Sequence, residues 1–222
     1  MLKPRDIYKQ IKVLTTDVIS SGLCEAENYP SMKKRPGYVT EIGITGVDNA
    51  VFLKSIPYVD MYQTLLEQRH FNMKMIDGAL LTMQYRFVKD RLSAHRLSYF
   101  PAPNLEAFQN DPELYLHDGI YADILDRRIV PVPFRFDYDN DEKTYQPVEH
   151  PISHLTLGQY KNCRIPVSSA LTPYQFLSFV LRNFYHVASL KYRLTVFRDK
   201  FEDSIFPNEQ ELLHINTPLY KS

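Results

Sequence analysis

The sequence has few cysteines, no tryptophan and no long apolar run. Its two cysteines, Cys24 and Cys163, form neither a disulfide framework nor a metal-binding spacing. No uninterrupted apolar stretch approaches the ~18 residues that a membrane span needs. The N-terminal MLKPRDIYKQIK carries charges and a proline where a secretory signal needs an apolar run. These absences predict a cytoplasmic protein that has no membrane partner.

An excess of charge of either sign is also missing, because 26 Lys and Arg residues balance 26 Asp and Glu residues. Net charge therefore favours neither nucleic acid nor a membrane surface as a partner. The distribution is uneven, since acidic residues prevail in Asn104–Glu149 and basic residues prevail in Gly158–Lys200. The two regions could attract each other within the fold, or the basic region could face an anionic ligand.

What the chain does have is length and aromatic side chains. Its 222 residues can bury a sizeable core. It holds 16 tyrosines, which suit strands and half-polar surfaces because the ring packs while the hydroxyl reaches water or a partner. We expect a single domain over 1–222, with an N-terminal helix and connector in 1–37, a sheet region in 38–170 and a C-terminal helix and tail in 171–222.

Apolar residues at helical spacing predict a helix at each end of the chain. One covers Lys3–Ser21 and a shorter one covers Tyr58–Arg69, with Asn28–Gly37 as a connector between them. Near the C-terminus, TPYQ from Thr172 has the cap, the proline and the glutamine of a capping box, and apolar residues continue on one face to Phe197. This pattern predicts a long helix that could break near Thr195. Short helices are also expected in the acidic region Asn104–Asp126.

Alternation of apolar and polar residues predicts the strands. The alternating segments are Tyr38–Ile44, Leu81–Val88, His95–Phe100, Phe134–Asp139 and His154–Leu157. Pro131 and Pro133 favour an edge strand or a strand entry at the fourth of these, because proline cannot donate to a sheet. The predicted fold is therefore α+β, with a mostly antiparallel sheet of about five strands flanked by N-terminal and long C-terminal helices.

The segment Pro131–Ser168 holds more charge and imidazole than ordinary core strands need. Along Phe134–Asp139, Arg135 and Asp137 share one face of the expected strand. His150 and His154 lie on the same side of an extended chain. If the two strands pair, His154 can lie beside Arg135 or Asp137. We assign Asp139 to a turn that continues to Asp141.

This grouping favours acid–base chemistry on an anionic substrate. A carboxylate beside an imidazole fixes its tautomer and raises its pKa, which suits proton transfer near neutral pH, and an arginine can hold a phosphate or stabilise developing negative charge. The candidate catalytic residues are His150, His154, Arg135 and Asp137, and the candidate substrate-binding residues are Arg164, Gln84, Arg86, His95 and Arg96. The chemistry would be metal-independent phosphodiester cleavage.

Other interpretations of the same residues stay open. Two histidines and an aspartate could bind a divalent metal, but no HxH or HExxH spacing supports a metal site, and no cofactor is expected. His154 could instead cap or bridge strands. A solvated sheet face is the alternative for Gln84, Arg86, His95 and Arg96. The basic triplet Lys33–Arg35 is expected in a solvent-facing loop. Gly43–Gly46 lacks the lysine of a phosphate-binding loop.

Several segments together resemble an uncharacterised bacterial family that carries only a domain-of-unknown-function label, DUF2290. They are His95–Pro101, Arg135–Tyr138, the run HPISHLTLGQYKNCRIPVS and the closing LTPYQFLSFVLRNFY. The resemblance covers most of the chain, roughly Tyr58–Tyr185, and implies no established activity. An aromatic–Arg–Asp strand followed by a His-rich strand is more loosely similar to small toxins of bacterial toxin–antitoxin pairs.

These features predict a cytosolic bacterial protein that acts on or binds nucleic acid. We expect it to be the effector of a defence or toxin–antitoxin module, with a partner protein encoded nearby. One alternative is a non-catalytic subunit of a multiprotein complex, whose Tyr-rich surface docks its partner. A further alternative is a nucleotide-sensing module that uses the same pocket.

Overall fold

A computed structural model describes residues 2–44, 56–103, 132–160 and 162–217. The described strands are β1 (Cys24–Glu27), β2 (Ser31–Arg35), β3 (Val39–Gly43), β4 (Met73–Met75), β5 (Leu80–Val88), β6 (Arg91–Phe100), β7 (Phe134–Asp139), β8 (Ser153–Leu157) and β9 (Ile165–Pro166). The described helices are α1 (Pro4–Ser20), α2 (Tyr58–Glu67), α5 (Pro173–Phe184), α6 (His186–Lys191) and α7 (Pro207–Gln210). Among these helices, none has the length and apolar character needed to cross a membrane.

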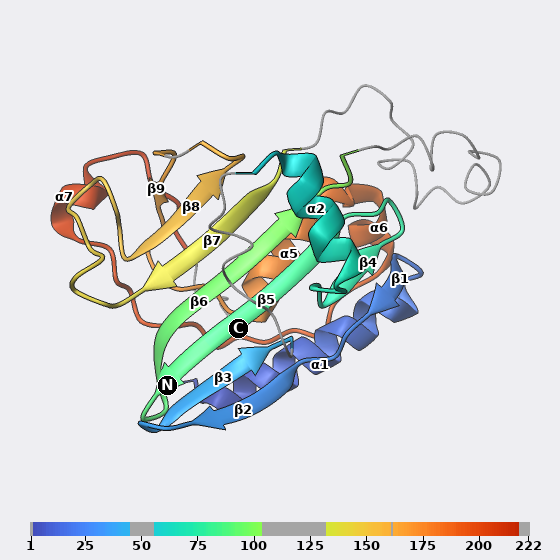
Figure 1. The fold of residues 1–222 in the computed structure, drawn as a ribbon, viewed down its shortest axis with the longest axis horizontal. Coiled ribbons are helices and arrows are strands. Elements are labelled where there is room, and N and C mark those ends of the chain that lie inside the picture. Colours follow the sequence, from blue (N-terminus) through green and yellow to red (C-terminus); the bar gives the residue numbers. More distant parts are fainter. Residues whose placement is uncertain (1, 45–55, 104–131, 161, 218–222) are drawn as a thin grey trace.

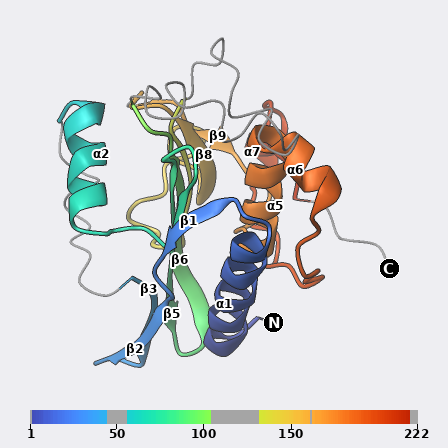
Figure 2. The same ribbon diagram turned by 90° about the vertical axis from the view of Figure 1, so that its right-hand side faces the viewer.

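The strands form one nine-stranded sheet, in which every described pair is antiparallel. The main path runs β1-β4-β5-β6-β7-β8-β9, while β3 also pairs with β5 and β2 pairs with β3. Helices α1, α5 and α6 cover one face, and α2 lies against part of the other (Figures 1 and 2). Of the described helices, none covers the rest of the second face.

The main core lies between the sheet and α1 and α5. Ile7, Ile11, Leu14 and Val18 recur on the buried stripe of α1 and are fully buried. From the sheet, Phe134 and Phe136 pack their rings against Phe176 of α5, with ring centroids 6.4–6.5 Å from it. Because successive strand residues point to opposite faces, burying Phe134 and Phe136 forces their polar neighbours onto the other face.

The predicted α+β class is confirmed, but the number of strands was wrong. The sheet has nine strands rather than about five. The missed strands β1, β2, β4 and β9 have two to five residues each, too short for a clear alternation. The expected connector Asn28–Gly37 contains β2, so Lys33 and Arg35 belong to a strand. The prediction for Asn104–Asp126 lies outside the described residues.

Strand β7 is interior, because it pairs with β6 on one side and β8 on the other. The edge-strand alternative was therefore wrong and the strand-entry alternative is confirmed. The proline carbonyl just before β7 still finds a partner, since the Gly158 N–H donates to the Pro133 oxygen at 2.6 Å. Interior placement gives Asp137 a neighbour on each side.

The long C-terminal helix was also wrong, since α5 ends at Phe184 and α6 begins at His186. Tyr185 between them has φ −135° and ψ 50°, outside the helical region. Its ring is buried, and its hydroxyl donates to the Asp77 carboxylate at 2.9 Å. The helix is therefore interrupted at Tyr185, where this contact forms, well before the break expected near Thr195.

The capping box at the start of α5 is confirmed, and its loss should be measurable. The Gln175 N–H donates to Thr172 Oγ1 at 3.2 Å, and the Thr172 N–H donates to Gln175 Oε1 at 2.9 Å. Thr172→Ala should lower the free energy of unfolding by about 0.5–2 kcal/mol, as for other N-caps, measured by urea unfolding. Thr195→Ala, at an exposed position outside the helices, is the control. Equal stability of the two variants would contradict a capping role.

Candidate functional site

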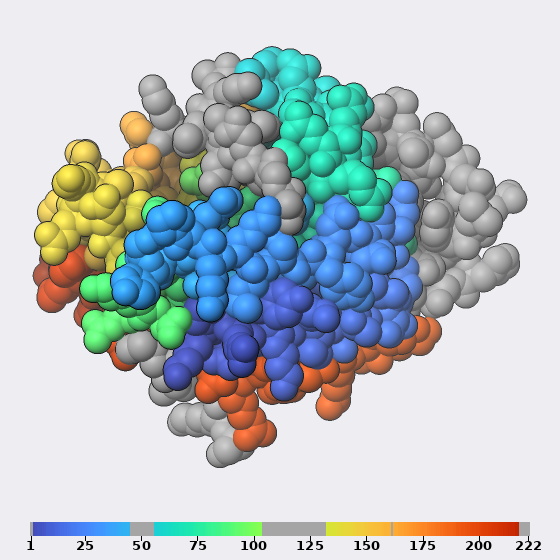
Figure 3. All heavy atoms as spheres, turned by 60° about the horizontal axis from the view of Figure 1, so that its bottom comes forward, coloured from blue at the N-terminus to red at the C-terminus, as the bar shows by residue number. Residues whose placement is uncertain are grey.

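The face of the sheet opposite α1 and α5 carries a polar pocket of about 760 Å³. Such a volume is typical of small-ligand sites. Figure 3 views its rim from the lower edge of the sheet, where light-blue β2 and β3, the green β5–β6 turn and the yellow residues after β7 lie side by side. All nine predicted site residues line it: Gln84, Arg86, His95, Arg96, Arg135, Asp137, His150, His154 and Arg164.

Strand register explains why these residues converge. Asp137 of β7 lies directly opposite Arg96 of β6 and His154 of β8. Gln84 of β5 lies opposite Arg96 in turn. Directly opposed residues of antiparallel strands share a face, so these four form one polar row across four strands. The expected placement of Asp137 and His154 on adjacent strands and a common face is confirmed.

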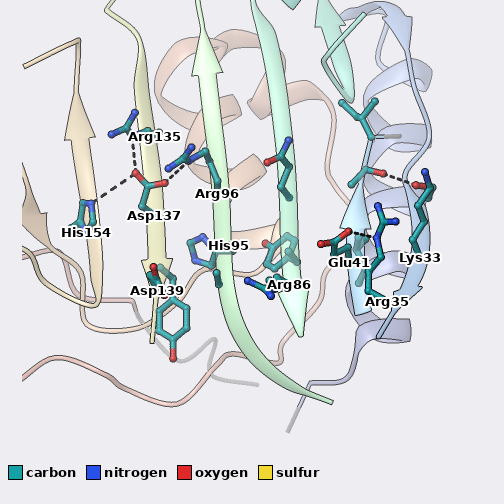
Figure 4. A pocket seen from close by; sticks show the side chains of 18 of the residues that line it. Lys33, Arg35, Glu41, Arg86, His95, Arg96, Arg135, Asp137, Asp139 and His154 are labelled. Atoms are coloured by element: carbon teal, nitrogen blue, oxygen red, sulfur yellow. Dashed lines mark hydrogen bonds and ion pairs between the residues drawn. The ribbon is translucent and has the colours of Figure 1, made fainter. Parts of the chain in front are cut away.

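Asp137 is the centre of what we call the Asp137 cluster, with Arg96, Arg135 and His154 (Figure 4). Arg96 Nε donates to Oδ1 at 2.8 Å and Arg135 Nε donates to Oδ2 at 2.6 Å. Burial of Asp137 would raise the pKa of its carboxyl, but the two guanidinium groups outweigh that effect and hold the pKa below its usual value. Asp137 is therefore a carboxylate that aligns two arginines, each with further N–H groups.

His154 has a defined tautomer. Its Nδ1 lies 2.8 Å from the Pro151 carbonyl oxygen, which can only accept, so Nδ1 carries the proton. Its Nε2 lies 3.8 Å from Asp137 Oδ2. Burial lowers the pKa of His154 to about 4, despite the opposing effect of Asp137. The expected rise in pKa was wrong, and at neutral pH this imidazole is neutral with a free lone pair on Nε2.

His150 lies beside His154, with ring centroids 5.0 Å apart. Its Nδ1 donates to the Thr144 carbonyl oxygen at 2.7 Å, so Nε2 is the nitrogen left for a ligand. His150 is half-buried, whereas His154 is almost fully buried. The two imidazoles thus have their Nδ1 atoms anchored to backbone and their Nε2 atoms available for proton transfer.

His95 borders the pocket but does not direct its ring into it. Its Nε2 accepts the Leu171 N–H at 3.0 Å, and its ring lies between Tyr85 and Tyr138 on the helix-covered side. Residues 95 and 96 are consecutive in a strand, so they point to opposite faces. In the described structure this histidine anchors the start of the Leu171–Thr172 segment to the sheet, and the substrate-binding role predicted for it stays a prediction.

The sequence interpretation missed a second group of charged residues in the pocket. Lys33 and Arg35 line it from β2 and Glu41 lines it from β3. The prediction of a loop for Lys33–Arg35 was wrong, because the strand β2 was not recognised. Lys33 and Arg35 lie two residues apart, which is the spacing of one strand face. Asp139 also lines the pocket, while its Oδ1 accepts the Asp141 N–H at 3.0 Å as the predicted turn requires.

The basic C-terminal region contributes less than its composition suggested. Of its described basic residues, Arg164 lines the pocket, and its Nη1 donates to the Glu149 carbonyl oxygen at 3.3 Å. Arg182 lies on α5, which covers the face away from the pocket (Figure 2), and Arg193 follows α6 and is not among the residues that line the pocket. The alternative that the basic region faces an anionic ligand stays a prediction, and Arg164 is its described member in this pocket. Within the described chain, no three His, Cys, Asp or Glu residues are grouped as a metal ion would need.

Two of the buried histidines, His95 and His154, predict a loss of stability in acid. Burial lowers the pKa of His95 and of His154 from 6.5 to about 4. Between these values the unfolded chain binds more protons than the folded chain, so the stability fully present above pH 6.5 falls as the pH drops towards 4. Urea unfolding from pH 7 to 4 should show this fall. The fall in stability with pH should be shallower in His95→Gln than in the exposed control His186→Gln. An equal slope in the two variants would contradict a lowered pKa for His95.

The fold and site define an α+β protein with a basic, imidazole-containing pocket on an antiparallel sheet. Residues 23–217 match the family described as Uncharacterized conserved protein (DUF2290), so the chain belongs to this family. Searches of curated proteins and of solved structures returned no match. The looser similarity to small toxins stays a prediction.

Proposed function

We propose that the pocket binds the phosphodiester backbone of single-stranded nucleic acid and cleaves it. The observation that carries this proposal is the Asp137 cluster beside His150, which combines two aligned guanidinium groups with two anchored imidazoles. Arginines held in place by a carboxylate are suited to bidentate phosphate contacts. Imidazoles with a free Nε2 are suited to proton transfer.

The geometry supports a distinct role for each group. Arg96 and Arg135 would hold the non-bridging phosphate oxygens and stabilise the charge that develops on them. Neutral His154 would accept a proton from the attacking hydroxyl at Nε2. His150, in its protonated form, would return a proton to the leaving oxygen. Asp137 would act as a positioning residue, because both of its oxygens already accept from arginine.

This division of labour predicts a preference for RNA. If the attacking group is the 2′-hydroxyl, its proton passes to His154 and the 5′-oxygen leaves with the proton from His150. DNA has no 2′-hydroxyl, so it should bind without being cut by this route. Cleavage of this kind would suit an effector of a defence or toxin–antitoxin module, which stays a prediction for this chain.

The test is to incubate the protein with labelled single-stranded RNA and DNA, with and without a chelator. We expect RNA cleavage that survives chelation, and DNA binding without cleavage. Arg96→Gln should weaken the binding of both, whereas Arg193→Gln, outside the pocket, should not. No binding of either nucleic acid would overturn the proposal, and cleavage abolished by the chelator would overturn its metal-independent chemistry.

A nucleotide-sensing module is a second candidate that one observation favours. His154 is almost fully buried and both Asp137 oxygens are engaged, as in a site built to bind rather than to turn over. Tight binding of nucleotides or RNA without cleavage would support this candidate. A docking role is the remaining alternative, and exposed Tyr38 and Tyr160 could serve it on the molecular surface.

A further inference from the structure

A second basic cluster lies at the opposite end of the same pocket. We call it the Glu41 cluster: Lys33, Arg35, Glu41 and Arg86, all of which line the pocket. In the register, Glu41 of β3 lies between Lys33 of β2 and Arg86 of β5. Arg35 Nε donates to Glu41 Oε2 at 3.0 Å. Three cationic side chains thus surround a single carboxylate, which leaves an excess of positive charge.

Two of these cations, Lys33 and Arg86, could bind an anionic ligand. Neither Lys33 nor Arg86 forms an ion pair with a described carboxylate, and the Arg86 side chain is exposed. Figure 4 shows Arg86 at the end of the Glu41 cluster nearer the Asp137 cluster, and Lys33 at the far end. An uncompensated cation in a pocket attracts anions and raises their local concentration. The Glu41 cluster is therefore a candidate subsite for a phosphate separate from the one at Asp137.

The distance between the clusters limits the size of the ligand. Neighbouring strands lie about 4.8 Å apart, and the order from one cluster to the other is β2, β3, β5, β6, β7. The outer ends of the two clusters, Lys33 and Arg135, are therefore separated by about 19 Å across the sheet. Their nearest members, Arg86 and Arg96, lie on the neighbouring strands β5 and β6, so cationic side chains continue across the face from one end to the other. A single phosphate group cannot contact both outer ends, whereas a chain of several nucleotides can.

The face also indicates which part of the nucleotide is recognised. Tyr85 and Tyr138 border the pocket, but Tyr85 directs its hydroxyl to the Leu171 carbonyl oxygen on the helix-covered side, at 2.9 Å. Tyr138 shares that side, because it lies opposite His95 in the register and stacks on its ring. Among the described residues that line the pocket, no tyrosine or phenylalanine ring therefore faces the two clusters as a stacking platform for bases.

We propose that the Glu41 cluster is a second phosphate subsite, so that the ligand is an oligonucleotide lying across strands β2 to β7. This rests on the proposed function, which it extends from one phosphate to several. The protein would hold the strand by its backbone, with little preference among bases. Affinity would then rise with length and fall steeply with salt, because each phosphate contact releases counterions.

The experiment measures binding of labelled single-stranded DNA from two to eight nucleotides long, by fluorescence anisotropy at several salt concentrations. DNA serves as the probe because it is expected to bind without being cut. For the wild-type protein we expect affinity to rise up to about four nucleotides, the low end for single-strand grooves, and then to level off. The double variant Lys33→Gln/Arg35→Gln, which changes the two cations on β2 at the end of the pocket far from Asp137, should bind a dinucleotide as the wild type does. It should bind the octanucleotide about tenfold or more weakly, with the salt slope reduced by about 1.4 for two lost contacts.

Two further variants separate this effect from misfolding. Arg193→Gln, an exposed arginine outside the pocket, should leave binding at every length unchanged. Glu41→Gln removes the negative charge inside the cluster and should tighten binding of long oligonucleotides only. A gain of affinity cannot come from a loss of folded protein.

The outcomes distinguish this inference from the proposed function. Equal affinity for two and eight nucleotides, or a length dependence that survives in the double variant, would overturn the second subsite and leave single-phosphate binding at Asp137 intact. Absence of binding at any length would overturn both. A strong preference for one base composition at equal length would contradict recognition by the backbone.

Discussion

Replacing His154 with alanine is expected to lower the rate of RNA cleavage by about 10²–10⁴-fold, the usual contribution of a general acid or base. The expected reason is the loss of Nε2 as proton acceptor, because Nδ1 is held by the Pro151 carbonyl oxygen. Binding should change little, since Arg96 and Arg135 keep their contacts with Asp137. Single-turnover cleavage at saturating protein, with binding measured in parallel, checks both statements.

Two other histidine variants are compared with His154→Ala: one in the same pair of rings and one control outside the pocket. His150→Ala alters a half-buried ring of the same pair and should also lower the rate, whereas His186→Ala, exposed on α6, should not. Thermal melting of each variant shows whether it is folded at the assay temperature. Cleavage at the wild-type rate by folded His154→Ala would remove this histidine from the mechanism.

Phe176→Ala is expected to cost about 3–5 kcal/mol of unfolding free energy, as for other fully buried phenylalanines. The ring has no exposed surface and packs edge-on against Phe134 and Phe136. Those two residues alternate with Arg135 and Asp137, so a poorly packed core beneath β7 should also loosen the Asp137 cluster. Urea unfolding measures the first effect, and RNA affinity at a temperature where the variant is folded measures the second.

A matched control is Leu213→Ala, since this leucine is 90% exposed. It should change the unfolding free energy by no more than about 0.5 kcal/mol. If Phe176→Ala and Leu213→Ala were equally stable, the packing of α5 on the sheet would not be what stabilises this fold.

The local patterns in the sequence were informative where neighbouring residues alone determine the outcome. The alternation from Phe134 to Asp139 predicted a strand with Arg135 and Asp137 on one face, because side chains alternate along any strand. The capping box at Thr172 and Gln175 predicted the first turn of α5, because its hydrogen bonds join residues three apart. The apolar spacing along α1 likewise predicted its buried stripe.

Other features depended on contacts between distant residues, and the sequence could not supply them. Strand β2 exists because Lys33 pairs with Glu41 across a short turn, and its own five residues give little signal. The end of α5 coincides with Tyr185 reaching Asp77, more than a hundred positions away in the chain. The pKa of His154 falls rather than rises because burial, a property of the folded whole, outweighs the nearby carboxylate.

The candidate site depends both on local sequence patterns and on contacts between distant residues. The sequence by itself determined which side chains share a face within each strand, and so identified residues that all line the pocket. It could not determine that His95 faces the helices, nor that Lys33 and Glu41 join the same pocket. Those outcomes depend on which face of each strand the core covers and on the order of strands in the sheet. Only the tertiary structure decides both, because they arise from the burial of apolar residues that are far apart in the chain.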